Sequence, residues 1–143
     1  MQELNECLNL AREIKEKREL LAEMQYRSIS PKNQILSGMP RGGGAQLNQI
    51  ERNLIQSEKL KKAIRALEHE RLETWKCATF RLKKAGVTND EHIKLLEMRF
   101  FYGFSWKKCN AIVTNLFPNS KWDINKCFRV YRASLRKVNI KTC

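Results

Sequence analysis

The sequence predicts an all-α fold, in which long N-terminal helices form a hairpin or coiled-coil-like part and three shorter helices follow. Apolar residues recur every three or four positions along most of the 143 residues, which is the spacing of amphipathic helices. The three prolines and six glycines are confined to short breaks between these periodic segments. No segment alternates apolar and polar residues as a half-buried strand does, so no sheet is expected.

Two long helices are expected before residue 85. The first spans residues 1–27 and the second residues 46–84, and each carries an apolar stripe without glycine or proline. Residues 28–46 hold two of the prolines and four of the glycines and are expected to form a flexible linker. At about 1.5 Å per residue the second helix is about 60 Å long, so the first helix or a second copy is expected to pack along it. Residues 1–85 are therefore expected to serve oligomerisation or partner binding. The stripe of the second helix comprises Leu47, Ile50, Leu54, Leu60, Ile64, Leu67, Trp75 and Leu82.

Three shorter helices are expected after residue 86. Thr88 and Glu91 have the spacing of a capping box at the start of the first of them. Ser105 and Asp123 are placed to cap the second and the third, and Pro118 interrupts the chain between these two. The apolar positions expected to face their core are Ile93, Leu96, Phe100, Trp106, Cys109, Ile112, Val113, Leu116, Cys127, Val130, Tyr131, Leu135 and Val138.

Positive charge is concentrated toward the C-terminus. The whole chain has 28 Lys and Arg against 15 Asp and Glu, a net charge of +13. Residues 1–80 hold 14 of the cations and 11 of the acids, whereas residues 81–143 hold 14 and 4, so the C-terminal part alone has a net charge of +10. Charge of this density predicts a polyanionic partner, and cations that neutralise the phosphates of nucleic acid release counterions.

Several classes of function find no support in the sequence. No apolar run approaches the roughly 20 residues of a membrane helix, and the N-terminus has no secretory signal, so a cytoplasmic protein without membrane contact is expected. The five cysteines and the two histidines, His69 and His92, form no metal-ligand spacing, so no metal is expected. No nucleophile stands beside a base in a recognisable pattern, so neither an enzyme nor a cofactor is expected.

The last predicted helix has a polar face of a single sign. No acidic residue follows Asp123, so the cations on this face repel one another, a cost that a polyanion offsets. Arginine and asparagine also suit guanine and adenine in the major groove. The preceding helix carries Lys107 and Lys108 in its first turn, where they are placed to clamp phosphate. We therefore expect DNA contacts from Lys107, Lys108, Lys121, Asn125, Lys126, Arg129, Arg132 and Arg136.

Two segments resemble region four of bacterial sigma factors. Residues 96–106, LEMRFFYGFSW, resemble the approach to the helix-turn-helix of that region, and residues 122–138, WDINKCFRVYRASLRKV, resemble its recognition helix. With residues 35–44, ILSGMPRGGG, joining the long helices, the layout is similar to that of the ArpU/RinA-type late-gene activators of phages. Residues 115–121 stand where the sigma factors have a tight turn that contains glycine, and resemble an insertion.

The resemblance implies a sequence-specific transcription regulator, an activator of phage late genes, in the cytoplasm of the bacterial host. Residues 86–143 would be its helix-turn-helix DNA-binding domain and residues 123–138 its recognition helix. The implied partners are double-stranded DNA, host RNA polymerase and a second copy of the chain. The main alternative is a helical protein-interaction module whose basic tail binds an acidic partner without recognising DNA sequence. RNA binding, or a basic face that is merely solvated, also stays open.

Overall fold

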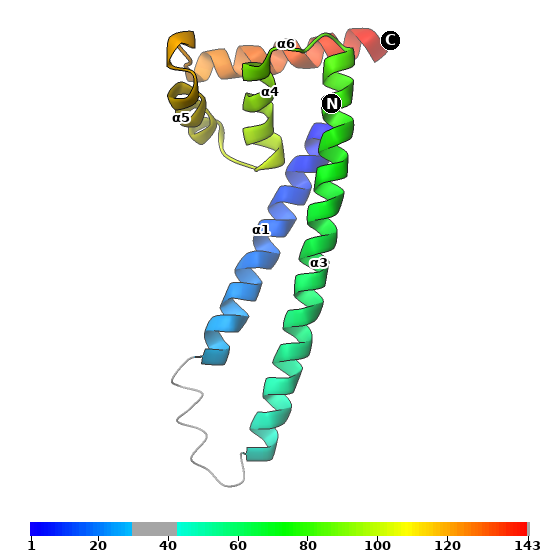
Figure 1. Cartoon of the computed structure of the whole chain (residues 1–143), viewed down its shortest axis with the longest axis vertical. Coiled ribbons are helices and arrows are strands. Elements are labelled where there is room, and N and C mark those ends of the chain that lie inside the picture. The colour runs from blue at the N-terminus through cyan, green and yellow to red at the C-terminus, as the bar shows by residue number, and fades with distance from the viewer. Residues whose placement is uncertain (30–42, 143) are drawn as a thin grey trace. The chain divides into compact units, whose positions relative to one another are not determined.

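The computed structural model describes residues 1–29 and 43–142, and the side chains of residues 1–26 and 50–140. This part of the chain is helical and contains no strand, so the predicted all-α class is confirmed (Figure 1). In chain order the elements are α1 (Gln2–Ile29), α3 (Gly43–Lys84), α4 (Asp90–Leu96), the π-helix η2 (Glu97–Phe101), α5 (Trp106–Leu116), the 3-10 turn η3 (Pro118–Ser120) and α6 (Ile124–Thr142).

The two long helices exceed their predicted lengths by a few residues. α1 continues to Ile29 and α3 begins at Gly43, so both extend into the predicted linker at 28–46. The remainder of that linker, residues 30–42, lies outside the described residues.

The chain divides into two compact units that do not follow the order of the sequence. Unit 1 combines Met1–Arg12 with His69–Cys143, and unit 2 consists of Glu13–Glu68. α1 and α3 each contribute to both units. The assignment of different roles to residues 1–85 and 86–143 concerns function rather than compactness and stays a prediction.

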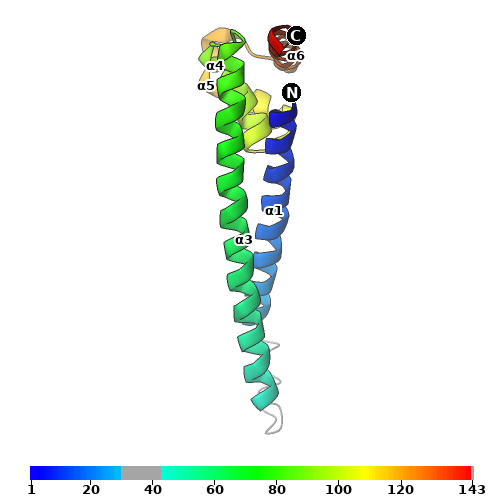
Figure 2. The ribbon, with the colours of Figure 1, turned by 90° about the vertical axis from the view of Figure 1, so that its right-hand side faces the viewer.

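In unit 2, α1 and α3 lie side by side with opposite chain directions, as both views show (Figures 1 and 2). Ile14 on α1 and Ile64 on α3 are both buried, with 1% and 7% of their surfaces exposed. The side chain of Arg18 on α1 forms an ion pair with that of Glu68 on α3. This pair links the two helices within unit 2.

The predicted apolar stripe of α3 is wrong at its N-terminal end. Ile50 and Leu54 are 55% and 59% exposed, whereas Ile64 further along is buried. These two predicted core positions therefore lie at the surface of α3. The side chain of Leu47, the first residue of the predicted stripe, lies outside the described residues.

Unit 1 has two apolar cores, and the first joins residues from both ends of the chain. Figure 1 shows α6 crossing the C-terminal end of α3, where side chains of these two helices share this core. The first core comprises Leu4, Cys7, Leu8, Trp75, Ala78, Leu82, Ala85, Val87, Leu96, Phe100 and Val138. The second core holds α4, η2, α5 and α6 together and comprises Leu95, Met98, Cys109, Val113, Trp122, Cys127 and Val130.

Polar contacts reinforce the attachment of the first turns of α1 to the rest of unit 1. Both carboxylate oxygens of Glu3 accept from Arg81 Nη1, at 2.5 and 2.6 Å, and this contact holds the pKa of Glu3 below its usual range. Gly103, in the turn after η2, has φ +75°, and a Cβ at this position would lie 3.1 Å from the Cβ of Ala11. A side chain at position 103 would therefore crowd α1, and glycine allows the turn to lie this close to the helix.

The start of α4 differs from the predicted capping box. Asn89, not Thr88, is the N-cap, and its Oδ1 accepts from the backbone N–H of Glu91 at 2.9 Å. The helix also does not run uniformly to Phe101, because its last turn widens into the π-helix η2. The other two predicted caps are confirmed: Ser105 Oγ accepts from Lys108 N at 3.2 Å, and Asp123 Oδ1 accepts from Lys126 N at 2.7 Å.

Candidate nucleic-acid interface

α6 is anchored to unit 1 along one side. Cys127, Val130, Ser134 and Val138 are all buried, and their spacings of three and four residues place them on one face of the helix. Ser134 is accommodated there because its Oγ donates to the carbonyl oxygen of Val130 at 2.8 Å. Tyr131 and Leu135, which were also predicted to face the core, are half-buried.

The opposite side of α6 is polar, exposed and positively charged. Asn125, Arg129, Arg132 and Arg136 follow one another at spacings of four, three and four residues, which places them on one face, and all four are exposed. We call these four residues the basic face. α6 contains no acidic residue, and among the described residues no carboxylate lies within ion-pair distance of these three arginines. The guanidinium groups are therefore available to a partner.

Lys126 was predicted to belong to the same interface, but its ammonium group is engaged within unit 1. Lys126 Nζ donates to the carbonyl oxygen of Ser120 at 2.6 Å and lies 4.4 Å from the centre of the Trp122 ring. Lys121, which adopts a left-handed conformation with φ 51°, separates these two contacts. Lys126 thus ties the first turn of α6 to the turn before it, and its role as a DNA contact stays a prediction.

The connection between α5 and α6 is a short ordered turn. Pro118–Ser120 form the 3-10 turn η3, and Ser120 Oγ donates to Glu91 Oε1 on α4 at 2.6 Å. Beyond this turn, Trp106 at the start of α5 packs against two rings of α6, with centroid distances of 5.3 Å to both Phe128 and Tyr131. These contacts hold α6 against α5.

The predicted lysines outside α6 are divided between two places. Lys107 is exposed in the first turn of α5, and Lys121 is exposed just before α6. Lys108 Nζ lies 4.0 Å from the centre of the Phe104 ring, a cation–π contact that leaves the ammonium at the surface. At the other end of α5, Leu116 was predicted to face the core but is 51% exposed. Four of the eight predicted site residues, those of the basic face, lie together on the exposed side of α6.

Two charged or titratable residues, one on α6 and one beside it, escaped the sequence prediction. Lys137 is an exposed cation next to Arg136, and the absence of acids from α6 was a signal that could have included it. His92 on α4 is half-buried, with its ring edge-on to Trp122 at 6.1 Å between centroids. Burial, and then the charges of Lys137 and Lys126, lower the pKa of His92 below its ordinary value of 6.5. No pattern in the sequence points to this histidine.

The buried thiols are poorly suited to chemistry. Burial raises the pKa of Cys7 to about 12 and that of Cys109 to about 11, so both are protonated at neutral pH and are weak nucleophiles. Within the described ranges, no three side chains of His, Cys, Asp and Glu gather into a group that could hold a metal ion. None of the helices in those ranges combines the length and the apolar character needed to cross a membrane.

Comparison with known proteins adds no family to this description. No model of a protein family matches the chain, and neither a curated protein nor a solved structure matches it significantly.

Proposed function

We propose that the chain is a sequence-specific DNA-binding regulator of transcription, which reads double-stranded DNA with the basic face of α6. The observation that carries this proposal is the exposure of three arginines and one asparagine on one helix face, where none of the described carboxylates lies close enough to neutralise them. Self-repulsion along such a face costs a few tenths of a kcal/mol per like-charged pair, and a polyanionic partner offsets that cost.

The helices around α6 support a helix-turn-helix in this role. In such motifs the second helix enters the major groove while the first crosses the DNA backbone. α6, held against α5 by Trp106, corresponds to the second helix, and its polar side faces away from the core. The positively charged side chains of Lys107 and Lys108, in the first turn of α5, suit a phosphate oxygen.

The wider role rests on the resemblance to the ArpU/RinA-type activators. Residues 86–143 carry the DNA-binding function, and the long helices of residues 1–85 meet a second copy of the chain or host RNA polymerase. The cytoplasm of a bacterial host, activation of phage late genes and a repeated or palindromic binding site belong to the same proposal.

The salt dependence of DNA binding tests the proposed interface. The full chain is titrated into a labelled duplex between about 50 and 200 mM salt, as wild type and as the variant R129A/R132A/R136A. The logarithm of the affinity falls linearly with the logarithm of the salt concentration, and each lost phosphate contact makes this slope less steep by about 0.9. The slope of the variant should therefore be less steep than that of the wild type by about 2 to 3. The variant R52A/K59A/K62A, which removes the same charge from exposed positions of α3, is the matched control and should retain the wild-type slope.

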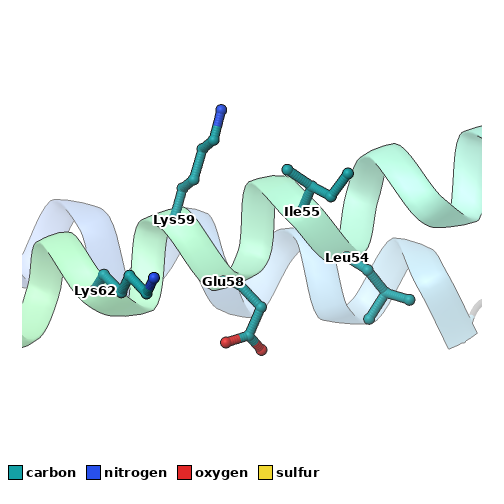
Figure 3. A pocket seen from close by; sticks show the side chains of 5 residues that line it. All are labelled: Leu54, Ile55, Glu58, Lys59 and Lys62. Carbon is teal, nitrogen blue, oxygen red and sulfur yellow. The ribbon is translucent and has the colours of Figure 1, made fainter.

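A protein-interaction module is the second candidate, favoured by the apolar surface at the N-terminal part of α3. Figure 3 shows Leu54 and Ile55 on this helix beside Glu58, Lys59 and Lys62, which together line a shallow hollow. Leu54 and Ile55 are 59% and 56% exposed. Weak affinity that is equal for all DNA sequences, and equal for the two triple variants, would favour this candidate over DNA recognition.

A further inference from the structure

We propose that Asn125 and Arg129 read an A·T pair and a G·C pair separated by one base pair, and that Arg132 and Arg136 hold the DNA backbone. This inference rests on the proposed function and divides the basic face into a part that specifies sequence and a part that supplies affinity. It predicts a property of the binding site itself, namely two specified positions with one unspecified position between them.

The chemistry of the two proposed readers is the first step. An asparagine amide pairs with N6 and N7 of adenine through one donor and one acceptor, and a guanidinium pairs with O6 and N7 of guanine through two donors. Asn125 and Arg129 are both exposed, and neither has a hydrogen-bond partner among the described side chains. Both side chains are therefore free to present these groups to base edges.

The distance between the two readers sets the spacing of the bases. Asn125 and Arg129 lie four residues apart on α6, which is about 6 Å along the helix axis. Stacked base pairs are about 3.4 Å apart, so this distance corresponds to about two base-pair steps. A helix that lies along the groove floor therefore brings the two side chains to pairs separated by one base pair.

The length of α6 decides what the remaining arginines reach. The major groove is about 12 Å wide, and a straight helix leaves its floor over a comparable distance. Arg132 lies about 10 Å and Arg136 about 16 Å along the axis from Asn125, so the first reaches the groove wall and the second lies beyond it. Phosphates line that wall, and an arginine contacts them without reading sequence.

The first turn of α6 is held in place, which favours its use for reading bases. Asp123 caps the helix through Lys126 N at 2.7 Å, and Lys126 Nζ holds the Ser120 carbonyl at 2.6 Å. Because Lys126 is engaged in this way, Asn125 is the polar side chain of the first turn that remains free. A side chain on a fixed turn loses little backbone freedom when it binds a base edge.

Selection of binding sites from a pool of randomised duplexes tests the division. The full chain is used as wild type and as N125A, R129A, R129K and R136A, with circular dichroism confirming that each variant is folded. All substituted side chains are exposed, so folding should be unaffected. N125A should lose the preference for A·T at one position, and R129A the preference for G·C two positions away. Each loss should be about 5- to 150-fold in discrimination.

The variants R129K and R136A distinguish the contribution of base recognition from the contribution of positive charge. R129K keeps the positive charge but replaces the rigid planar fork of donors with a flexible ammonium, so it should weaken the G·C preference and retain the salt slope of the wild type. R136A should select the wild-type site while its salt slope falls by about 0.9.

The outcomes distinguish this inference from the proposed function. A wild-type chain that enriches no sequence from the pool overturns the proposed function and the inference together. A wild-type site that N125A and R129A still select unchanged, or a change of site in R136A, overturns the inference alone and leaves DNA recognition standing.

Discussion

Replacement of Leu4 by alanine tests whether the beginning of α1 is a structural part of the unit that carries α6. Leu4 is only 1% exposed and belongs to the first core together with Trp75, Leu82 and Val138. Removing a leucine side chain from a site that is this well buried costs about 2 to 5 kcal/mol, because apolar contacts are lost and a cavity remains. Alanine is a better helix former than leucine, so α1 itself should persist.

Tryptophan fluorescence is a suitable probe, because the three tryptophans of the chain, at 75, 106 and 122, all belong to unit 1. A cost of about 3 kcal/mol, with a urea dependence of about 2 kcal/mol per molar, lowers the midpoint of unfolding by about 1.5 M. Leu20→Ala is the matched control, since Leu20 lies on the same helix but is 49% exposed. It should shift the midpoint by less than about 0.5 M.

The reasoning is refuted if Leu4→Ala and Leu20→Ala leave the fluorescence transition at the same urea concentration. In that case α1 would contribute nothing to the stability of unit 1, and residues 69–143 would hold α6 without it.

Three further measurements address other features of unit 1. Gly103→Ala should destabilise the unit by about 1 to 3 kcal/mol in the same urea titration, because φ is +75° and the added Cβ meets α1. A variant as stable as the wild type would contradict this conformation of the turn. Since burial lowers the pKa of His92 below 6.5, the unfolded chain binds the proton more tightly. The unfolding free energy should therefore fall as the pH drops below about 6.5, and His92→Gln should weaken this dependence; an equal dependence in the variant would exclude His92 as its source. Iodoacetamide should label the exposed Cys77 of the folded chain and spare Cys7 and Cys109, whose burial and raised pKa protect them; mass spectrometry that finds equal labelling would contradict their burial.

The local features of the fold were predictable where neighbouring residues decide them. Ser105 and Asp123 precede helices and cap them, as their side chains and positions indicated. The cap of α4 was misassigned because Thr88 and Asn89 are adjacent and both are good caps, so the choice between them depends on backbone angles. The π-helix η2 was not predictable, since one extra residue per turn leaves no mark in a short apolar pattern.

Features that depend on distant parts of the chain were not predictable. Periodicity assigned Ile50 and Leu54 to the buried stripe of α3, but both are exposed, because spacing along one helix does not tell which of its turns another part of the chain covers. Likewise, helical spacing placed Lys126 with the cations of the last helix, whereas its ammonium is bound by the Ser120 carbonyl. That contact requires the turn at η3 and the left-handed Lys121, neither of which a helical wheel contains.

The basic face was predictable from the sequence only in part. Spacing alone placed Asn125, Arg129, Arg132 and Arg136 together, and the structure finds all four exposed on one side of α6. Whether an intramolecular carboxylate would neutralise them depends on the packing of α6 against the rest of unit 1. The structure finds no such carboxylate among the described residues, and this is the reason to propose an external polyanion.

The most direct test of the role of α6 compares how well the wild-type chain and R129A/R132A protect DNA from cleavage. A duplex that contains a site selected by the wild-type chain is the substrate, and R52A/K59A serves as the control that removes equal charge from α3. We expect the wild type and the control to protect one discrete segment, and R129A/R132A to protect none at the same concentration. Protection of the same segment by R129A/R132A, with equal affinity, would show that α6 does not read the DNA.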